Sequence, residues 1–241
     1  MRIAIISDIH GNREALDTVL EKIDSLGVEK IFCLGDVVGY GPDPGYCVEK
    51  VAERCEMTLA GNHEYAVLGK INIDYFNPHA RQATLWTRDH LTAEQVQLIS
   101  QYPLTHVWDK CTFVHGTLDS PDLFDYIQTS YDAHLSLERL ENRVCFIGHS
   151  HVPVAFLQND SAITYSTDYI VDLSDVVKSI VNVGSVGQPR DGNPNASFAT
   201  YDVEAEQVEL FRCPYDLEST QEKIMEAGLP PFLAERLAVG R

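Results

Sequence analysis

The sequence is poor in basic residues: 18 Lys and Arg stand against 36 Asp and Glu, and the formal net charge is −18. A surface that binds nucleic acid or an anionic membrane needs clustered Lys and Arg, so this balance argues against both partners. An anionic small substrate stays open, provided that some local feature reverses the sign of the charge. We therefore expect a small substrate, no nucleic-acid surface and no membrane surface.

Long apolar runs and paired cysteine motifs are also lacking. No stretch approaches the roughly 20 apolar residues that span a bilayer, and the first apolar run reaches Asp8 too early for a signal peptide. The six cysteines form no C-x-x-C pair, and Cys33, Cys111 and Cys145 lie inside apolar runs. A free thiol behaves there as a small hydrophobe, which is typical of a reducing cytosol. We expect a cytoplasmic protein, either a monomer or a homo-oligomer.

Short apolar runs alternate with helical patterns in the first part of the chain. Residues 2–7, 30–34 and 57–60 have the continuous apolar character of buried strands, whereas 12–26 and 46–55 have helical spacing. This β-α-β-α-β alternation predicts parallel strands joined by right-handed crossovers. The fold class is therefore predicted to be α/β.

The later part of the chain changes in character. A helical insertion is predicted over about 65–110, and buried strands resume at 111–114 and 144–147, with a helix at 135–140 between them. Short strands separated by polar turns follow and predict antiparallel pairing. Their ranges are 152–157, 162–167, 180–183, 197–202 and 207–211. No linker or repeat divides the chain, so we expect a single domain over 1–241.

Five of the predicted strands end in a small residue next to a side chain that can bind a metal. These ends are Ser7-Asp8-Ile9-His10, Gly35-Asp36, Gly61-Asn62-His63, His115-Gly116 and Gly148-His149-Ser150-His151. Five of the nine histidines lie there. Each motif alone could be an ordinary turn or a buried core histidine. Because sites in parallel α/β sheets form at the carboxyl ends of the strands, the set together predicts one metal site.

Spacing assigns the side chains within this site. Asp8 and His10, like His149 and His151, are two residues apart and would face the same side of an extended chain. Asn62 and His63 are adjacent, so in an extended chain one would be a ligand and the other would address the substrate. Carboxylate, imidazole and amide ligands suit Mn²⁺, Fe²⁺ or Zn²⁺.

The number of ligands and their charge predict two ions. There are too many ligands for one ion, and two ions that share one carboxylate would use them all. Two divalent ions bring four positive charges, and Asp8 and Asp36 bring two negative ones. The result is a local anion trap in an otherwise acidic protein.

In this order the five motifs resemble those of the calcineurin-like metallophosphoesterases, from the first strand to about residue 200. The combination of Asp-Ile-His-Gly-Asn with Gly-Tyr-Gly-Pro-Asp-Pro is similar to the small prokaryotic phosphodiesterase branch of that family. Some members of the branch hydrolyse dinucleoside polyphosphates or artificial phosphodiesters. The resemblance implies a four-layer αββα sandwich, in which helices flank two mixed β-sheets.

The resemblance also implies a role for each site residue. Asp8, His10, Asp36 and His151 would hold one metal, and Asp36, Asn62, His115 and His149 would hold the second. Asp36 would then bridge the two ions, and His63 would face the substrate, with Asn62 beside it. Mn²⁺ is the first expectation for the metal, with Fe, Zn or Ni as alternatives.

Part of the family pattern is missing. Protein phosphatases of the family continue as Gly-Asp-x-x-Asp-Arg-Gly, whereas Gly39 and Tyr40 stand here at the Asp and Arg positions. This difference weakens a phosphoprotein-phosphatase interpretation and leaves open what orients His63. Arg13, Tyr40 and Arg190 are candidates for the phosphate contact, although each could equally be a turn or surface residue.

The expected activity is hydrolysis of a phosphodiester, or of a phosphoanhydride or monoester, in a small nucleotide-type substrate. A metal-bridging hydroxide would attack the phosphorus, and Asp36 and His63 would be the catalytic residues. His63 would stabilise the developing charge or protonate the leaving group. The alternatives are a dinucleoside polyphosphate hydrolase, a protein serine/threonine phosphatase and a non-catalytic interaction scaffold of the same fold. The intact ligand set argues against the scaffold.

Overall fold

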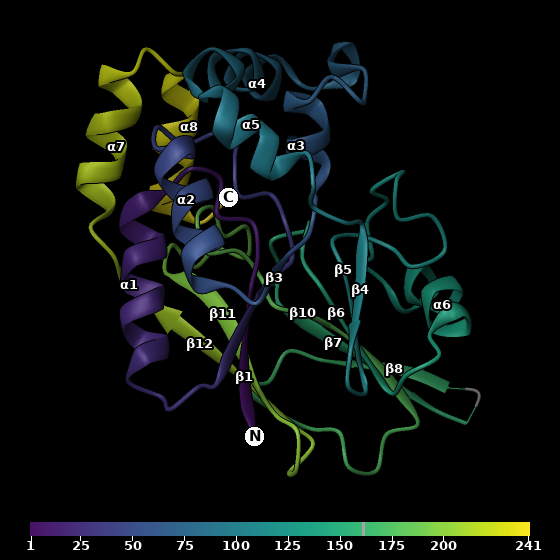
Figure 1. Cartoon of the computed structure of the whole chain (residues 1–241). Helices are drawn as coiled ribbons and strands as arrows, with labels where there is room; N and C mark the ends of the chain where they lie inside the picture. The colour runs from purple at the N-terminus through teal and green to yellow at the C-terminus, as the bar shows by residue number, and fades with distance from the viewer. Residues whose placement is uncertain (161) are drawn as a thin grey trace.

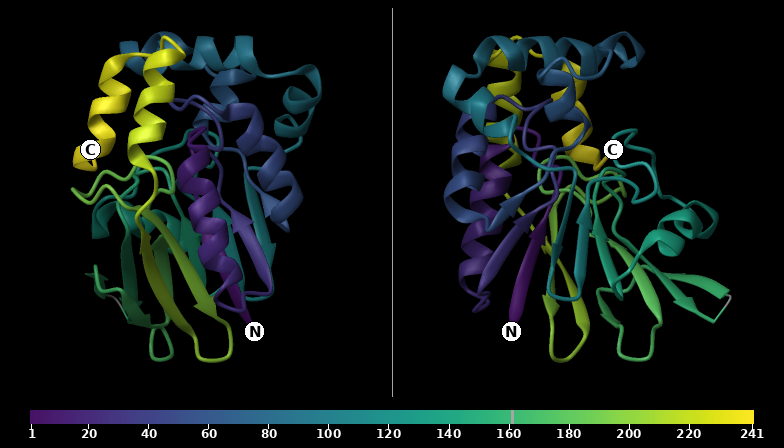
Figure 2. Two further views of the ribbon diagram at one scale, coloured as in Figure 1. Left: turned by 90° about the vertical axis from the view of Figure 1, so that its left-hand side faces the viewer. Right: turned by 45° about the vertical axis from the view of Figure 1, so that its right-hand side comes forward.

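The computed structural model describes residues 1–160 and 162–241, whose strands form two facing six-stranded sheets (Figures 1 and 2). In spatial order the first sheet consists of β3 (Met57–Thr58), β2 (Lys30–Cys33), β1 (Arg2–Ile6), β11 (Ala196–Asp202), β12 (Gln207–Cys213) and β9 (Ile170–Asp172). The second consists of β4 (Thr105–Trp108), β5 (Cys111–Val114), β6 (Val144–Ile147), β10 (Lys178–Asn182), β7 (Val154–Asn159) and β8 (Ala162–Ser166). Strands β1, β2 and β3 are parallel, as predicted.

Helices cover the outer face of each sheet. Those packed on the first sheet include α1 (Arg13–Asp24) and α2 (Pro44–Arg54), and α6 (Ser130–Arg139) packs on the second (Figure 1). Above the strand ends lie α3 (Asn62–Val67), η1 (Ile73–Tyr75), α4 (Pro78–His90), α5 (Ala93–Ile99), α7 (Leu217–Glu226), α8 (Pro231–Glu235) and η2 (Arg236–Val239). The predicted αββα sandwich of two mixed sheets is confirmed.

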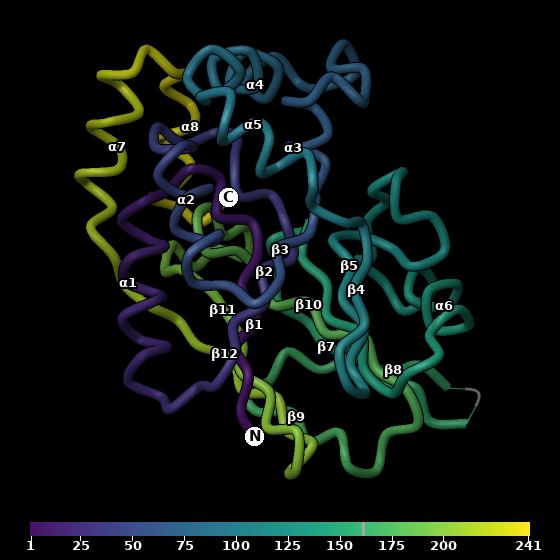
Figure 3. The backbone as a smooth tube through the Cα atoms, viewed as in Figure 1, coloured from purple at the N-terminus to yellow at the C-terminus, as the bar shows by residue number. Residues whose placement is uncertain are grey.

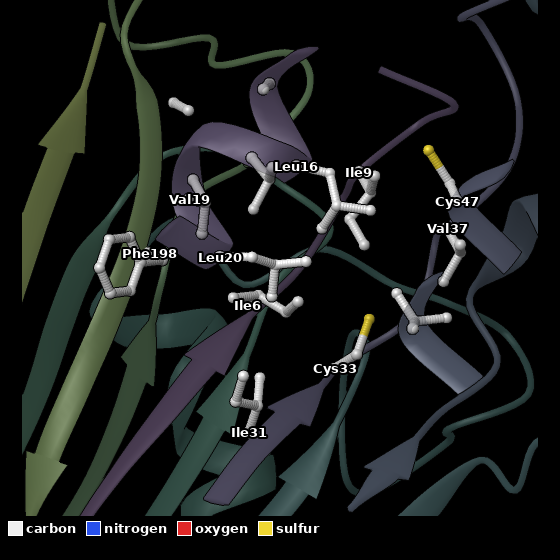
Figure 4. Close-up of a cluster of buried hydrophobic side chains, with 14 of the residues drawn as sticks. Ile6, Ile9, Leu16, Val19, Leu20, Ile31, Cys33, Val37, Cys47 and Phe198 are labelled. Carbon is white, nitrogen blue, oxygen red and sulfur yellow. The ribbon is translucent and has the colours of Figure 1, made fainter. Parts of the chain in front are cut away.

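The apolar run of β1 explains how the layers hold together, because both of its faces are buried. Ile3 and Ile5 point between the sheets, where Phe32 stacks on Phe113 with ring centroids 4.6 Å apart. Ile6 points the other way, into the cluster beneath α1 and α2 (Figure 4). Each such side chain contributes about 1.5–3 kcal/mol by leaving water. This packing fixes the direction of β1 and hence the position of the loop that follows it.

The structure corrects several predicted elements. Residues 105–108, inside the predicted helical insertion, form β4, which pairs antiparallel with β5. The strand has only four residues at a sheet edge, so its pairing with β5 decides its conformation. Strand β9 was not predicted, and β10, expected among antiparallel strands, pairs parallel with β6 as well as antiparallel with β7. Helix α6 begins at Ser130 instead of 135, because Thr129 and Asp132 form a capping box.

The structure can be compared with two features that the sequence lacks, paired cysteine motifs and long apolar runs. All six cysteines are free thiols, in agreement with the lack of a paired motif. Over residues 1–160 and 162–241, no helix combines the length and the apolar character needed to cross a membrane.

Candidate metal centre

The predicted ligands lie where the carboxyl ends of strands from both sheets meet. Asp8 and Asp36 follow β1 and β2 of the first sheet, whereas His115, His149 and His151 follow β5 and β6 of the second. All are buried, with at most 6% of any residue exposed. The strand ends converge, as expected, and they come from both sheets.

The backbone at these positions is not extended. Asp8, His10, His149 and His151 have φ values of 54°, 50°, 66° and 59°. The argument that two-residue spacing in an extended chain aligns each pair is therefore wrong, although the side chains do meet. Residues other than glycine seldom adopt this left-handed region, and such strain tends to gather at functional sites.

The adjacent pair Asn62 and His63 also departs from the expected backbone. Both residues belong to the first turn of α3 and are not extended. The helical turn, and not the alternation of a strand, therefore sets the directions of the two side chains. Asn62 Oδ1 is buried with no hydrogen-bond partner among the described residues, whereas the backbone N–H of His63 donates to Asp36 Oδ1 over 2.8 Å.

A first group of ligand atoms gathers around Asp8. His151 Nε2 lies 3.2 Å from Asp8 Oδ1 and 3.1 Å from His10 Nε2. His10 Nε2 is also 3.7 Å from Asp36 Oδ2. Asp8, His10 and His151 have the mutual spacing needed to hold one ion.

A second group shares Asp36 with the first. His115 Nε2 lies 3.3 Å from Asp36 Oδ2 and 3.2 Å from His149 Nδ1. Asp36, His115 and His149 have the spacing to hold an ion of their own. One oxygen of Asp36 is thus within reach of histidines from both groups, which is the arrangement that a shared carboxylate requires.

Backbone carbonyls orient three of the histidines. The contacts are His10 Nδ1 to Val38 O at 3.0 Å, His115 Nδ1 to Leu34 O at 2.9 Å and His151 Nδ1 to Gln188 O at 2.6 Å. A carbonyl can only accept, so each Nδ1 carries the proton and donates. The Nε2 lone pairs then point into the cluster, as metal-bound histidines require.

Several buried polar atoms of the cluster have no hydrogen-bond partner within the described chain. Two of them are carboxylate or amide oxygens of predicted ligands, Asp8 Oδ1 and Asn62 Oδ1. His149 Nε2 also has no partner, but it is the opposite ring nitrogen, Nδ1, that faces His115. Leaving such an atom unpaired costs about 1–3 kcal/mol. A metal ion at each group would satisfy these two oxygens, and the N and O donor set of the cluster suits a divalent transition ion. The residues therefore fit a metal centre.

The protonation of the imidazoles agrees with this function. Burial lowers the pKa of His149 to about 3, with the positive charge of His115 acting in the same direction. Burial also lowers the pKa values of His10 and His151. These rings are therefore neutral at physiological pH, which is the form that binds a metal.

The carboxylates are ionised. Burial acts to raise the pKa of Asp36, but His115, His63 and His10 together outweigh it, and the pKa is lowered well below its usual value. Burial likewise opposes the lowering of the Asp8 pKa, which results chiefly from His151. Burial acts to lower the pKa of His115, but the neighbouring carboxylates, chiefly Asp36, raise it to about 9.

Glu64 holds the loop that carries Asp36, a role that we did not predict. Its carboxylate accepts backbone N–H groups from Asp36, Val37 and Gly61, each over 2.8 Å. The loops after β2 and β3 are thereby joined. The sequence contained a signal for this role, because a glutamate three residues after Gly61 has the spacing of a capping box.

The imidazole ring of His63 is held by aromatic rings and not by a carboxylate. Its ring centroid lies 4.5 Å from that of Tyr40 and 5.7 Å from that of Phe76, and its Nδ1 has no partner among the described residues. Gly39 makes this position available, because a Cβ there would overlap His63 Nδ1. Gly39 and Tyr40 stand at the Asp and Arg positions of the protein-phosphatase motif. Gly39 thus leaves space for the His63 ring, and Tyr40 packs against it.

Gly39→Ala is expected to displace the His63 ring and to lower kcat by about 10²-fold, the typical cost of moving a catalytic group by 1 Å. The metal content, measured by mass spectrometry, should not change. Gly27→Ala is the matched control, because Gly27 also has a positive φ of 66° but would place its Cβ in open space. Equal kcat values for the two variants would contradict the role of Gly39.

The three predicted phosphate contacts have different surroundings. The Arg190 guanidinium lies 5.8 Å from the Tyr40 ring, whose centroid is 4.6 Å from that of His10, so both residues adjoin the centre. Arg13 instead lies over the Tyr46 ring at 4.2 Å and pairs with Asp17 on the surface of α1. This position argues against its predicted contact with the substrate.

A further aromatic contact was not predicted. Tyr126, in the loop before α6, stacks on His149 with centroids 4.0 Å apart. No local pattern marks an isolated tyrosine in a loop. Behind it, a cavity of about 570 Å³ lies between the start of α6 and strands β7 and β8, and Ser150 lines the side nearest the metal ligands.

Comparison with known proteins agrees with this geometry. Residues 1–206 match the calcineurin-like phosphoesterase superfamily domain. The chain belongs to this superfamily. A crystal structure of a metallophosphoesterase from Sphaerobacter thermophilus is 40% identical and superimposes with a TM-score of 0.89, covering 100% of this chain and 99% of the other. Membership and the Asp/His cluster together indicate a metal-dependent phosphoesterase.

Two further proteins are similar to this phosphoesterase in sequence. An uncharacterised protein of Methanocaldococcus jannaschii is 38% identical over 99% of this chain and 98% of its own length. Phosphodiesterase YfcE of Escherichia coli K12 is 25% identical over 84% of this chain and 88% of its own. The family resemblance predicted from the five motifs is confirmed.

Proposed function

We propose that this phosphoesterase uses two metal ions to hydrolyse a phosphodiester or phosphoanhydride of a small, nucleotide-type substrate. The observation that carries the proposal is the position of Asp36 Oδ2, which lies 3.7 Å from His10 Nε2 of one group and 3.3 Å from His115 Nε2 of the other. Asp8, His10, Asp36 and His151 would hold one ion. Asp36, Asn62, His115 and His149 would hold the second, with Mn²⁺ as the first candidate for both.

Two ions in these positions would lower the pKa of a bound water and neutralise the phosphoryl oxygens. The protein's own groups define where this happens. Carbonyl contacts keep the histidine lone pairs inward, and the deep burial of the ligands excludes bulk water. Two divalent ions would outweigh the two negative charges of Asp8 and Asp36, so the loaded centre would be positive and would attract an anionic group in spite of the acidic surface.

His63 is the group placed for proton chemistry. It is anchored to Asp36 through its backbone N–H, and its ring is packed by Tyr40. Burial lowers the pKa of His63 to about 4, so the neutral ring would donate a hydrogen bond to the developing charge on the phosphoryl group. Proton transfer to the departing oxygen is the alternative role. Both roles require the ring in the position that Gly39 leaves open.

The substrate class rests on two features. The name of the E. coli relative describes a phosphodiesterase, which favours a diester. Gly39 and Tyr40 replace the residues expected of a protein phosphatase, which disfavours a phosphoprotein. A nucleotide-type substrate combines the required phosphate with a group small enough to approach buried ligands.

A substrate panel tests the proposal. The protein loaded with Mn²⁺ is assayed with bis-p-nitrophenyl phosphate, p-nitrophenyl phosphate, a dinucleoside polyphosphate and a phosphoserine peptide. We expect kcat/KM for the diester or the dinucleoside polyphosphate to exceed that for the peptide by about 10-fold or more. A chelator should abolish the activity, and Mn²⁺ should restore it. If none of the four substrates is cleaved, or if the peptide is the preferred substrate, the proposal is contradicted.

A further inference from the structure

A cavity of about 570 Å³ lies beside the metal centre, and no step of the proposed hydrolysis involves it. It is found on the outer face of the second sheet, between the start of α6 and strands β7 and β8. Figure 3 shows α6 beside β8 at the edge of that sheet. Since a cavity of about 150 Å³ holds one benzene ring, this cavity has room for a group of two fused rings.

The walls of the cavity are mainly apolar. Val154 and Phe156 are two residues apart on β7, so both face α6 and pack in the apolar cluster beneath it. Tyr165 of β8 pairs directly with Phe156 and extends this wall. Ile127, in the loop before α6, lines the cavity from the other side. None of the lining residues in the described part of the chain carries a charge.

Backbone donors at the start of α6 are already paired with a carboxylate of the protein. The N–H groups of Gln128 and Thr129 donate to Asp132 Oδ2 over 3.1 and 2.9 Å. Asp132 thus supplies the negative charge that a helix N-terminus favours. An anionic group of a ligand would meet this carboxylate and the apolar walls, where an unpaired charge is costly. The cavity therefore favours a neutral, mainly apolar group.

Two segments connect the cavity to the metal centre. Ser150 lines the cavity and stands in the chain between the ligands His149 and His151, and consecutive Cα atoms are only about 3.8 Å apart. Ile127 lines the cavity too, and the preceding residue, Tyr126, stacks on His149 with ring centroids 4.0 Å apart. A group in the cavity can therefore belong to the same molecule as a phosphoryl group at the centre.

We propose that this cavity binds a neutral, mainly apolar organic group of the substrate while the phosphoryl group lies at the metal centre. The inference rests on the proposed hydrolysis and adds the chemistry of the organic part, which is an aryl or alkyl group of about two rings in size. A charged organic group has no partner in the cavity.

The position of the cavity indicates which ester group it holds. His63, the group placed for proton chemistry, lies on the side of His10, with ring centroids 4.8 Å apart. The cavity instead adjoins His149 through Tyr126. A departing group beside His63 leaves the cavity to the organic group that stays on the phosphorus.

The kinetic test keeps the leaving group constant and varies the group that stays on the phosphorus. The Mn²⁺-loaded protein is assayed with the p-nitrophenyl phosphodiesters of methanol, 2-naphthylmethanol and choline. We expect kcat/KM for the naphthylmethyl ester to exceed the values for the methyl and choline esters by about 10-fold or more. Equal values for the three esters would overturn the inference.

Two variants of Val154, which is half-buried in the cavity wall, locate the preference. Val154→Trp fills the cavity, and Val154→Glu places a charge in it. Each should lower the ratio of the naphthylmethyl to the methyl kcat/KM by about 10-fold and should retain the bound metal. Val107→Trp is the matched control, since Val107 lies on β4 at the opposite edge of the same sheet and is 59% exposed. A naphthylmethyl preference that persists in both Val154 variants refutes the cavity as its source.

Binding separates this inference from the proposed hydrolysis. The neutral fluorescent probe N-phenyl-1-naphthylamine is titrated into the protein, and we expect Val154→Glu to weaken its binding by about 10-fold and Val107→Glu to leave it unchanged. If no ester is cleaved but this selective loss occurs, the hydrolysis proposal fails and the apolar site stands. If esters are cleaved but neither the naphthylmethyl preference nor probe binding responds to the Val154 variants, hydrolysis stands and the apolar site is refuted.

Discussion

Asp36→Asn is expected to lower kcat by more than the roughly 10–100-fold that changes around metal ligands typically cost, and to remove at least one of two bound ions. Asp36 Oδ1 accepts the backbone N–H of His63 over 2.8 Å, whereas Oδ2 faces both histidine groups. An asparagine keeps its oxygen at the His63 N–H, because an amide nitrogen cannot accept there. Its NH₂ group then points at the ions, where it cannot act as a ligand.

The measurement is metal content by mass spectrometry beside steady-state kinetics. Asp24→Asn is the control for the loss of one negative charge, since Asp24 is an exposed residue that pairs with Arg54. It should retain both ions and full activity. Two ions and near-parental kcat in Asp36→Asn would refute the bridging role of Asp36.

His63→Gln is expected to lower kcat by about 10²–10⁴-fold, the usual contribution of a positioned proton donor. Both ions should remain, because the proposed ligand sets do not include His63. The dependence on the leaving group identifies the chemical role. A larger loss with an alkyl ester than with a p-nitrophenyl ester indicates proton transfer to the departing oxygen, and an equal loss indicates stabilisation of the phosphoryl charge.

The alternative to be tested is that His63 is itself a ligand. Its ring atoms lie close enough to His10 and Asp36 for the three to hold an ion. Loss of a metal ion from His63→Gln would therefore overturn its assignment as the proton donor. His134→Gln provides the control, because His134 is exposed on α6 and pairs with Glu138.

The sequence by itself determined the parallel strands β1, β2 and β3 of the first sheet and the residues of the candidate centre. An apolar run such as Ile3 to Ile6 can only be buried on both faces, and helices between such runs impose parallel strands. The polar residues after each run must then lie at one edge. This reasoning depends on local periodicity alone, which is why it placed Asp8, Asp36 and His115 correctly in relation to their strands.

The backbone conformation at the ligands could not be predicted from the sequence. Spacing of two residues suggested aligned side chains in an extended chain, but Asp8 and His10 occupy left-handed turns. Asn62 and His63 likewise lie in the first turn of α3 and not in an extended chain. Such turns depend on hydrogen bonds from distant segments, for example from the N–H of His10 to the carbonyl of Asp36. No local pattern encodes them.

The tertiary structure alone decided that the centre lies between two sheets and what surrounds it. Phe32 and Phe113 join the sheets across the core, and their stacking brings the ends of β2 and β5 together. The packing of Tyr40 and Phe76 on His63 depends on contacts between segments that are separated in the chain. Periodicity indicates which face of an element is buried, but not which other element buries it. The ligands could therefore be predicted from the sequence, whereas the support of His63 could not.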